Sequence, residues 1–165
     1  MFTIRALTPE TWEPYAALIE RNKGVWGRCW CMGIHPKGPG WGKSAEAYRA
    51  EKQARVWAGT AHAALVFEGE DCRGWAQYGR PAEVPRIKNR KEYETGLGAS
   101  PLPDWRITCF FVDPAARKRG VADAALDGAL KFIAASGGRR GRRVPGCGRG
   151  QDALVFSVPR HGAQF

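Results

Sequence analysis

The chemistry that the sequence suggests first is the binding of a bulky anion at a short basic loop, residues 117–122. This loop reads Arg-Lys-Arg-Gly-Val-Ala and lies between a strand-like and a helix-like pattern. Main-chain N–H groups at a helix N-terminus have no intrahelical partner, so they can bind an anion. Gly120 permits a positive φ, and the small Ala122 lets a ligand approach the backbone closely. We therefore expect a phosphate-sized site, the alternative being an ordinary strand-to-helix connection with a solvated basic loop.

Two regular elements must position this loop. Residues 105–112 are dense in aromatic and β-branched types and end at Asp113-Pro114, which interrupts a strand ladder. After the loop, apolar residues recur at spacings of three and four, which predicts a helix with one apolar stripe that begins near Gly120. The residues of this stripe are Ala122, Leu126, Ala129, Leu130 and Ile133.

The motif V-D-P-x-x-R-x-x-G-x-A in this strand–loop–helix setting resembles the acetyl-CoA-binding core of the GNAT superfamily of N-acyltransferases. The matching positions are Val112, Asp113, Pro114, Arg117, Gly120 and Ala122. The resemblance implies that main-chain amides near Phe111 and Val112 hold the pantetheine and polarise the thioester carbonyl. It also implies that the loop wraps the CoA pyrophosphate with its main-chain amides. The residues of that loop are Arg117, Lys118, Arg119, Gly120, Val121 and Ala122.

The resemblance further implies an α/β (α+β) fold, in which a mixed, mostly antiparallel central sheet is flanked by helices. The implied reaction is direct transfer of an acetyl group from acetyl-CoA, as cosubstrate, to a primary amine of a small molecule or peptide. Two other functions remain open: a catalytically silent GNAT-fold module that binds or senses CoA, and a small basic nucleic-acid-binding protein. The latter is disfavoured, because the arginine-rich C-terminal part has few aromatic residues on which bases could stack.

A general base is needed, because a primary amine is mostly protonated at neutral pH. Glu68, Glu83 and Asp104 are candidates because they lie at the ends of predicted strands. Cys109 is a further candidate on the predicted cofactor strand, although a role in the apolar core is favoured for it. The sequence therefore leaves the catalytic residue unassigned.

The remaining pattern predicts further strands and helices before the motif. The segment 80–103 contains four prolines and a charged run, which predicts a solvated loop, or else an insertion that borders the acceptor site. The predicted strands are 2–6, 62–68 and 72–78, and the predicted helices are 8–22 and 44–58.

A glycine-rich stretch, residues 24–43, carries three tryptophans and a Cys-Trp-Cys-Met run. A metal site would have to use Cys29, Cys31 and His35, with Cys72 added. We expect no metal, because zinc sites usually separate paired cysteines by two or more residues. The favoured interpretation is an aromatic loop that packs over the sheet and helps to form a substrate pocket. The run also resembles one subgroup of bacterial GNAT proteins, without indicating a role.

The length of 165 residues suits one domain, and we place the GNAT-like part at 1–138. Residues 139–165 form an atypical glycine- and arginine-rich tail in which only 153–158 is strand-like. The family's last helix and closing strand have no counterpart here, and no tyrosine follows Tyr93 to protonate the leaving thiolate. A frameshifted tail, a genuine basic arm and a disordered tail are the three interpretations.

Charge and cysteine content indicate the compartment and the partners. The net charge is +10, and residues 139–165 contribute six arginines against one acid, Asp152. This balance favours an anionic partner such as CoA. The five cysteines are an odd number without the spacing of a disulfide framework, and no apolar run could span a membrane. We expect a cytoplasmic protein with reduced thiols and no membrane partner, and homodimerisation follows from the resemblance alone.

Overall fold

The computed structural model describes residues 1–24, 30–36, 44–86, 90–97, 103–137, 141–144 and 153–156. Short 3₁₀ turns lie at Pro9–Thr11, Met32–Ile34 and Pro114–Ala116. The helices are α1 (Trp12–Arg21), α2 (Ala45–Trp57), α3 (Arg90–Leu97) and α4 (Val121–Ala135). The strands are β1 (Thr3–Ala6), β2 (His62–Glu68), β3 (Asp71–Gly79), β4 (Trp105–Val112), β5 (Gly141–Val144) and β6 (Ala153–Phe156).

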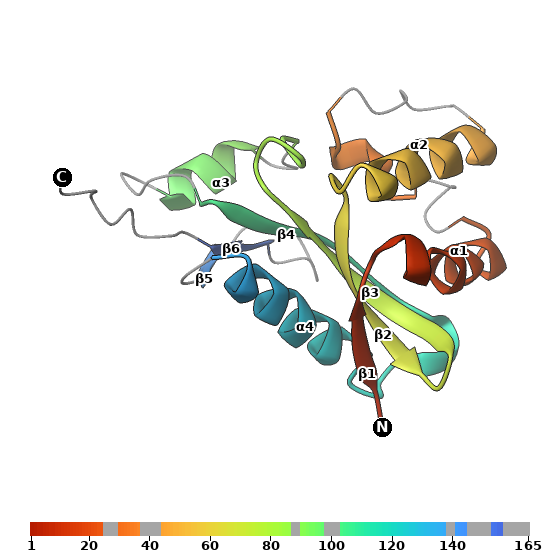
Figure 1. The fold of residues 1–165 in the computed structure, drawn as a ribbon. Helices are drawn as coiled ribbons and strands as arrows, with labels where there is room; N and C mark the ends of the chain where they lie inside the picture. Colours follow the sequence, from red (N-terminus) through yellow and green to blue (C-terminus); the bar gives the residue numbers. More distant parts are fainter. Residues whose placement is uncertain are drawn as a thin grey trace, which may run out of the picture.

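The strands form one sheet in the order β1-β2-β3-β4-β6-β5, seen in Figure 1. All pairs among the described strands are antiparallel. The predicted sheet flanked by helices is confirmed, and the antiparallel pairing extends to every described neighbour. β2 and β3 form a hairpin, and β4 pairs with β3 on one side and with the C-terminal strand β6 on the other.

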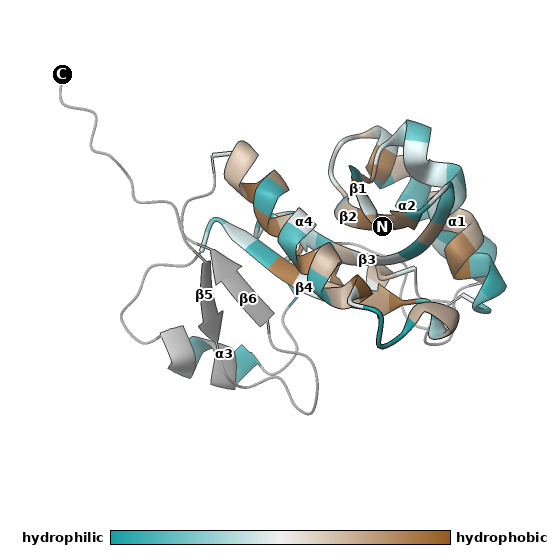
Figure 2. Cartoon of the chain, turned by 90° about the horizontal axis from the view of Figure 1, so that it is seen from below, coloured by the Kyte–Doolittle hydropathy of each residue, from teal (hydrophilic) through white to brown (hydrophobic). Residues whose placement is uncertain are grey.

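Helices cover both faces of the sheet. α4 lies on one face, whereas α1, α2 and the segment 30–36 lie on the other (Figure 1). Side chains alternate along β2, so that Ala64 and Val66 face α4 while Leu65 and Phe67 face α1. Figure 2, coloured by the hydropathy of each residue, shows hydrophobic and hydrophilic residues interspersed along α1 and α4.

Part of the tryptophan-rich stretch lies inside the described structure. Trp30 is buried and stacks on Trp12 of α1, with ring centroids 5.6 Å apart. Met32 is also buried in the same core cluster, which includes Trp75 of β3. The segment 30–36 therefore packs over the sheet as predicted, whereas residues 25–29 and 37–43 lie outside the described residues.

The structure differs from the sequence prediction at two elements. α3 falls within 80–103, which the prolines had indicated as a loop. The prolines lie before and after this helix and do not interrupt it. An Arg90–Glu94 ion pair of 2.7 Å spans one of its turns. β5 adds a strand in the stretch predicted as tail and pairs with β6. The strand predicted at 153–158 is present at 153–156, and the rest of 145–165 lies outside the described residues.

The buried face of α4 is rotated relative to the predicted stripe. Ala122 is exposed, so the predicted stripe is wrong at this position, whereas Leu126 and Leu130 are half-buried and pack against the core. Gly128 is the reason: a Cβ there would lie 2.4 Å from Ile4 Cγ2, so a glycine lets the helix lie close on the sheet. Because glycine has no side chain, the apolar pattern of the sequence does not indicate that Gly128 lies on the buried face. The residues that α4 buries are Val121, Ala125, Gly128, Ala129 and Ile133.

Candidate active site

The loop between β4 and α4 forms a cradle of main-chain N–H groups, which we call the cradle (residues 117–123). Lys118 and Gly120 both adopt left-handed backbone, with φ of 60° and 80°. Gly120 is the N-cap of α4, and its carbonyl accepts the N–H of Ala124 at 3.0 Å. The N–H groups of 121–123 therefore precede the first intrahelical bond. A Cβ on Gly120 would meet no described atom within 4 Å, so the described residues leave open space beside this glycine of the cradle.

The three cations of the cradle have different surroundings. Arg119 forms a two-bond ion pair with Glu68, one bond of which, from Nη1 to Oε2, measures 3.3 Å. Arg117 and Lys118 are exposed and form no ion pair with any residue that the structure describes. The charge available to an anion in front of the cradle therefore comes mainly from Arg117 and Lys118, while Arg119 anchors the loop to the end of β2.

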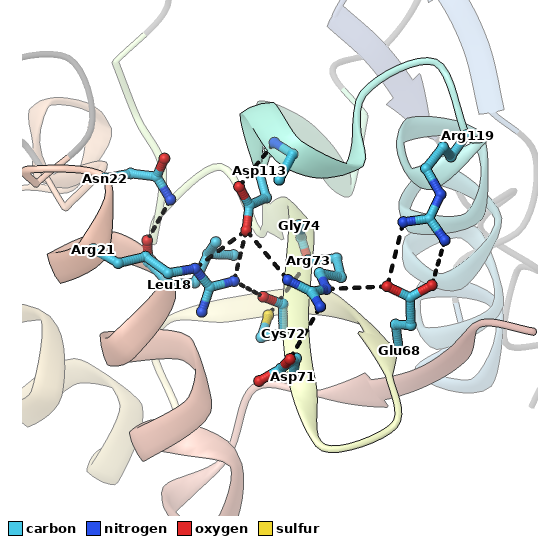
Figure 3. A network of polar contacts seen from close by, with 11 residues as sticks. Leu18, Arg21, Asn22, Glu68, Asp71, Cys72, Arg73, Gly74, Asp113 and Arg119 are labelled. Carbon is cyan, nitrogen blue, oxygen red and sulfur yellow. Dashed lines mark hydrogen bonds and ion pairs between the residues drawn. The ribbon is translucent and has the colours of Figure 1, made fainter.

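A chain of ionic contacts connects α1 to the cradle, as Figure 3 shows. The Arg21 guanidinium donates to Asp113 Oδ2 at 3.1 Å and 2.8 Å. Arg73 lies 3.8 Å from the same carboxylate oxygen and donates to Glu68 at 3.2 Å. Glu68 in turn binds Arg119. The cradle is thereby held at a fixed place relative to three strands and a helix.

Asp113 is ionised in this network. Burial alone would raise its pKa, but the hydrogen bonds from Arg21 and from the N–H of Ala115, with the charge of Arg73, lower that pKa below its usual range. The bond to Ala115 is 3.1 Å and caps the turn that follows β4. The aspartate of the V-D-P motif therefore shapes the start of the loop.

Gly74 on β3 allows α4 to begin close to the sheet. A Cβ at this position would lie 2.6 Å from the Phe111 carbonyl oxygen and 2.7 Å from Val121 Cγ1. Cβ atoms in folded proteins essentially never lie this close to another heavy atom, so any larger residue would displace β4 or the first turn of α4. A glycine inside a strand often marks such an approach. It places the cradle directly at the end of β4.

Beyond Ile107, none of the described strands pairs with the edge of β4 turned away from β3, which we call the open edge. The pairing with β6 covers only Trp105–Ile107 among the described residues, whereas β3 pairs with β4 as far as Val112. The N–H of Asp113 donates to Arg73 O at 2.8 Å, so it points toward β3. Successive amides of a strand point in opposite directions. The amides of Phe110 and Val112 therefore point to the open edge, and that of Phe111 points to β3.

None of the candidate bases is singled out by its surroundings. Glu68 has a lowered pKa, chiefly because Arg119 donates to it, and this weakens it as a base. Burial alone would raise the pKa of Glu83, but hydrogen bonds from His62 at 3.4 Å and from the N–H of Arg80 at 2.7 Å lower it. Asp104 is exposed. Cys109 is half-buried, with its Sγ 3.0 Å from another thiol.

The structure also gathers a buried polar cluster that the sequence did not indicate, on the face of the sheet covered by α2. Lys52 Nζ lies 3.3 Å from His35 Nε2 and donates to Gln77 Oε1 at 3.1 Å. Gln77 Nε2 lies 3.1 Å from the same His35 nitrogen, and His35 Nδ1 lies 2.9 Å from the Glu83 carbonyl oxygen. This pattern requires a neutral imidazole with its proton on Nδ1. The spacing of Lys52 between Tyr48 and Val56 was the one available signal, because it places the lysine on the buried face of α2.

Two further features of the described residues concern metal binding and membrane spans. The metal alternative included Cys29, which lies outside the described residues, and the described ones contain no group of three His, Cys, Asp or Glu side chains arranged to hold a metal ion. Within the same residues, no helix has the length and apolar character to cross a membrane.

Comparisons with known proteins bear on the fold. No protein-family model matches the chain, and no curated protein does. An aminoglycoside N-acetyltransferase solved with CoA superposes with a TM-score of 0.54 at 18% identity, over 83% of this chain and 72% of that one. The same enzyme with a bisubstrate analogue gives 0.54 and 18% over 83% and 74%. A GCN5-related N-acetyltransferase from Ralstonia eutropha gives 0.49 and 18% over 83% and 78%.

The first two superpositions define the class of fold. With these similarities and the observed sheet and helices, the chain has the fold of the GNAT acyl-CoA N-acyltransferases, as the motif at 112–122 had predicted.

Proposed function

We propose that this protein transfers an acetyl group from acetyl-CoA to a primary amine. The observation that carries the proposal is the pairing of two features at one point of the fold. The open edge of β4 presents the amides of Phe110 and Val112, and the cradle with its open space follows directly. Two structures that share the fold were solved with CoA or with a CoA-containing bisubstrate analogue.

The cradle supplies the groups that a pyrophosphate needs. The N–H groups of 121–123 and the positive end of the α4 dipole attract an anion, and the dipole contributes about 0.3–1 kcal/mol at an exposed helix end. The side chains of Arg117 and Lys118 add exposed positive charge. The exposed Ala122 and the glycine at 120 keep the backbone accessible. Arg119 contributes by holding the loop through Glu68.

The open edge of β4 supplies the electrophilic part of the site. A pantetheine arm that lies along this edge accepts hydrogen bonds from Phe110 and Val112, in place of a neighbouring strand. The thioester carbonyl oxygen gains negative charge as the amine attacks, and a fixed amide N–H such as that of Val112 stabilises it. Removing one such donor typically costs a factor of about 10²–10³ in rate. The C–N bond forms, the C–S bond breaks and CoA leaves as the thiolate.

The acceptor belongs to the class of small-molecule or peptide amines. The bisubstrate analogue in one fold neighbour joins CoA to acetylneamine, which supports a small-molecule amine. The amine attacks the thioester in its neutral form, so a group of this chain or a water must take its proton. The contacts of the four sequence candidates, Glu68, Glu83, Asp104 and Cys109, do not assign this role to any one of them.

Calorimetric titration with acetyl-CoA tests the cofactor site. Gly120→Trp places a large side chain in the open space before the cradle and should abolish binding. Gly59→Trp is the matched control, because Gly59 also has a positive φ, of 66°, and open space around its Cβ. Both variants carry the same backbone strain, of about 1–2 kcal/mol, so the difference between them reports the anion site.

An acceptor screen tests turnover. Release of free CoA in the presence of a panel of amines, with acetylated product identified by mass spectrometry, would support the transferase. Binding of acetyl-CoA without turnover of any amine would instead favour a silent CoA-binding module. If the folded wild-type chain binds no acetyl-CoA, or if both tryptophan variants bind as the wild type does, the proposed site is refuted.

A further inference from the structure

Two cysteine thiols from distant parts of the chain meet on the face of the sheet covered by α1 and α2. Cys31 lies in the segment 30–36 and Cys109 lies on β4, 78 positions further along the chain. Their sulfur atoms are 3.0 Å apart, and both cysteines are present as thiols. A disulfide bond is about 2.05 Å long, so the two sulfurs need to approach by only about 1 Å to form one.

The tertiary structure holds the two thiols together. Trp30 and Cys31 have φ of 44° and 54°, left-handed conformations that residues other than glycine seldom adopt. Two such residues in succession turn the chain toward β4. The stacking of Trp30 on Trp12 and the complete burial of Met32 keep this turn in place. Strained backbone of this kind persists only where the surrounding packing over-determines it, and it often occurs at functional sites.

The two thiols differ in exposure, and access of the reagent is one factor that decides which thiol reacts first. Cys109 is half-buried, whereas Cys31 is only 6% exposed. A small reagent therefore reaches Cys109 first, and Cys31 lies directly behind it. A thiol that is attacked from solvent and a second thiol in contact with it are the two components of a dithiol–disulfide couple.

We propose that Cys31 and Cys109 form a redox-active dithiol that reacts with low-molecular-weight disulfides, of which glutathione disulfide is the test reagent. The Cys109 thiolate attacks one sulfur of the reagent, which forms a mixed disulfide and releases one glutathione thiolate. The Cys31 thiolate then attacks the Cys109 sulfur, so that the Cys31–Cys109 bond forms and the second glutathione leaves. The two cysteines lose two electrons, the reagent gains them, and the two thiol protons end on the two glutathiones.

The proposal does not rest on the proposed acetyl transfer, and the chain contains its own control. Cys72 is also buried in the core on this face, but burial raises the pKa of its thiol to about 12, and its Sγ faces the Gly74 carbonyl oxygen at 3.6 Å. A thiol of that kind is inert toward exchange at pH 8, because the thiolate is the nucleophile. Cys72→Ala should therefore leave the reaction unchanged.

Peptide mapping of the full chain tests the proposal. The folded protein is incubated with glutathione disulfide at pH 8, remaining thiols are alkylated, and the chain is digested with trypsin. The expected product joins residues 29–37 to residues 107–117. Because Cys29 is in the same peptide as Cys31, the reaction is repeated with Cys29→Ala, which should keep the link, and with Cys31→Ala, which should lose it.

A second measurement does not depend on the cysteine variants folding equally well. A cross-link between residues so far apart in sequence restricts the unfolded chain, so oxidised wild-type protein should melt several degrees above the reduced form, and dithiothreitol should reverse the shift. The proposal is overturned if Cys109 ends as a stable glutathione adduct, if neither thiol reacts while the chain stays folded, or if the link maps to Cys29.

Discussion

The buried imidazole of His35 makes the stability of this protein depend on pH to a degree that can be worked out from its contacts. Its Nε2 faces Lys52 and Gln77, and its Nδ1 donates to the Glu83 carbonyl oxygen. A proton on Nε2 would have no acceptor and would face the Lys52 ammonium. Burial first, and then the charges of Lys52 and Arg55, lower the pKa of His35 from 6.5 to about 3.

The sign follows from the direction of this shift. Below pH 6.5 the unfolded chain binds a proton at His35 that the folded chain does not bind, so acid favours unfolding. The contribution of His35 to stability is complete above the unfolded pKa and is lost progressively as the pH falls toward the folded pKa. Between pH 8 and pH 5 the loss is about 2 kcal/mol for one such group. That loss is a large share of a typical free energy of unfolding, about 5–15 kcal/mol.

Urea unfolding of the wild type and of His35→Gln at several pH values measures this loss. The glutamine variant should be less stable at pH 8, because it loses hydrogen bonds, but its deficit should shrink by about 2 kcal/mol at pH 5. His62→Gln is the matched control, because His62 is a half-buried histidine beside Glu83. This variant should keep the loss of stability between pH 8 and pH 5 that His35 causes. A deficit that stays constant across this range, or a His35 ring signal that titrates near 6.5 in NMR spectra, would refute the reasoning.

Three other predictions concern the elements around the site. Gly128→Ala should lower the free energy of unfolding by about 1–3 kcal/mol in denaturant titrations, because the new Cβ would lie 2.4 Å from a side chain of β1. An unchanged midpoint would show that α4 can move away freely. Asp113→Asn should destabilise by about 1.5–3 kcal/mol at pH 7, through loss of a charged hydrogen bond to α1. Because the pKa of Asp113 is lowered, this deficit should begin to shrink as the pH falls below about 4 and should vanish only below the lowered pKa of the folded state. A deficit that stays constant in acid would contradict it. Arg117→Gln and Lys118→Gln should each weaken acetyl-CoA binding about two- to fivefold in low salt, as calorimetry would measure. Arg119→Gln should also weaken acetyl-CoA binding, but its loss of affinity should depend less on salt concentration. The same dependence on salt for all three variants would contradict the assigned roles.

Local patterns were sufficient to predict most of the elements. The strands β1 to β4 and the helices α1, α2 and α4 lie where alternation, helical spacing and caps had placed them. Ser44 accepts the N–H of Ala47 at 3.2 Å, as an N-cap does. The start of α4 near Gly120 was also predicted, and this glycine uses the positive φ that its residue type permits. Each of these signals involves residues within about one turn of one another, which is why one sequence could show them.

Contacts between distant residues could not be predicted in this way. Arg119 and Glu68 are 51 positions apart, and nothing in either segment indicates that the loop cation would bind the end of β2 rather than face a ligand. The buried cluster of His35, Lys52 and Gln77 comes from a loop, a helix and a strand. Such polar groups are buried only because each satisfies the others, and that condition depends on the packing of all three elements.

The sequence by itself therefore determined the kind of site, and the tertiary structure determined which atoms serve it. A glycine before an amphipathic helix and after an apolar strand is sufficient to predict main-chain N–H groups that face an anion. Whether that loop is accessible depends on Gly74, which allows α4 to begin against β3, and on where β6 stops pairing with β4. These are properties of backbones brought together across the sheet. The sequence alone does not show these close approaches, because the distances between the strands are set only when the strands pair in register.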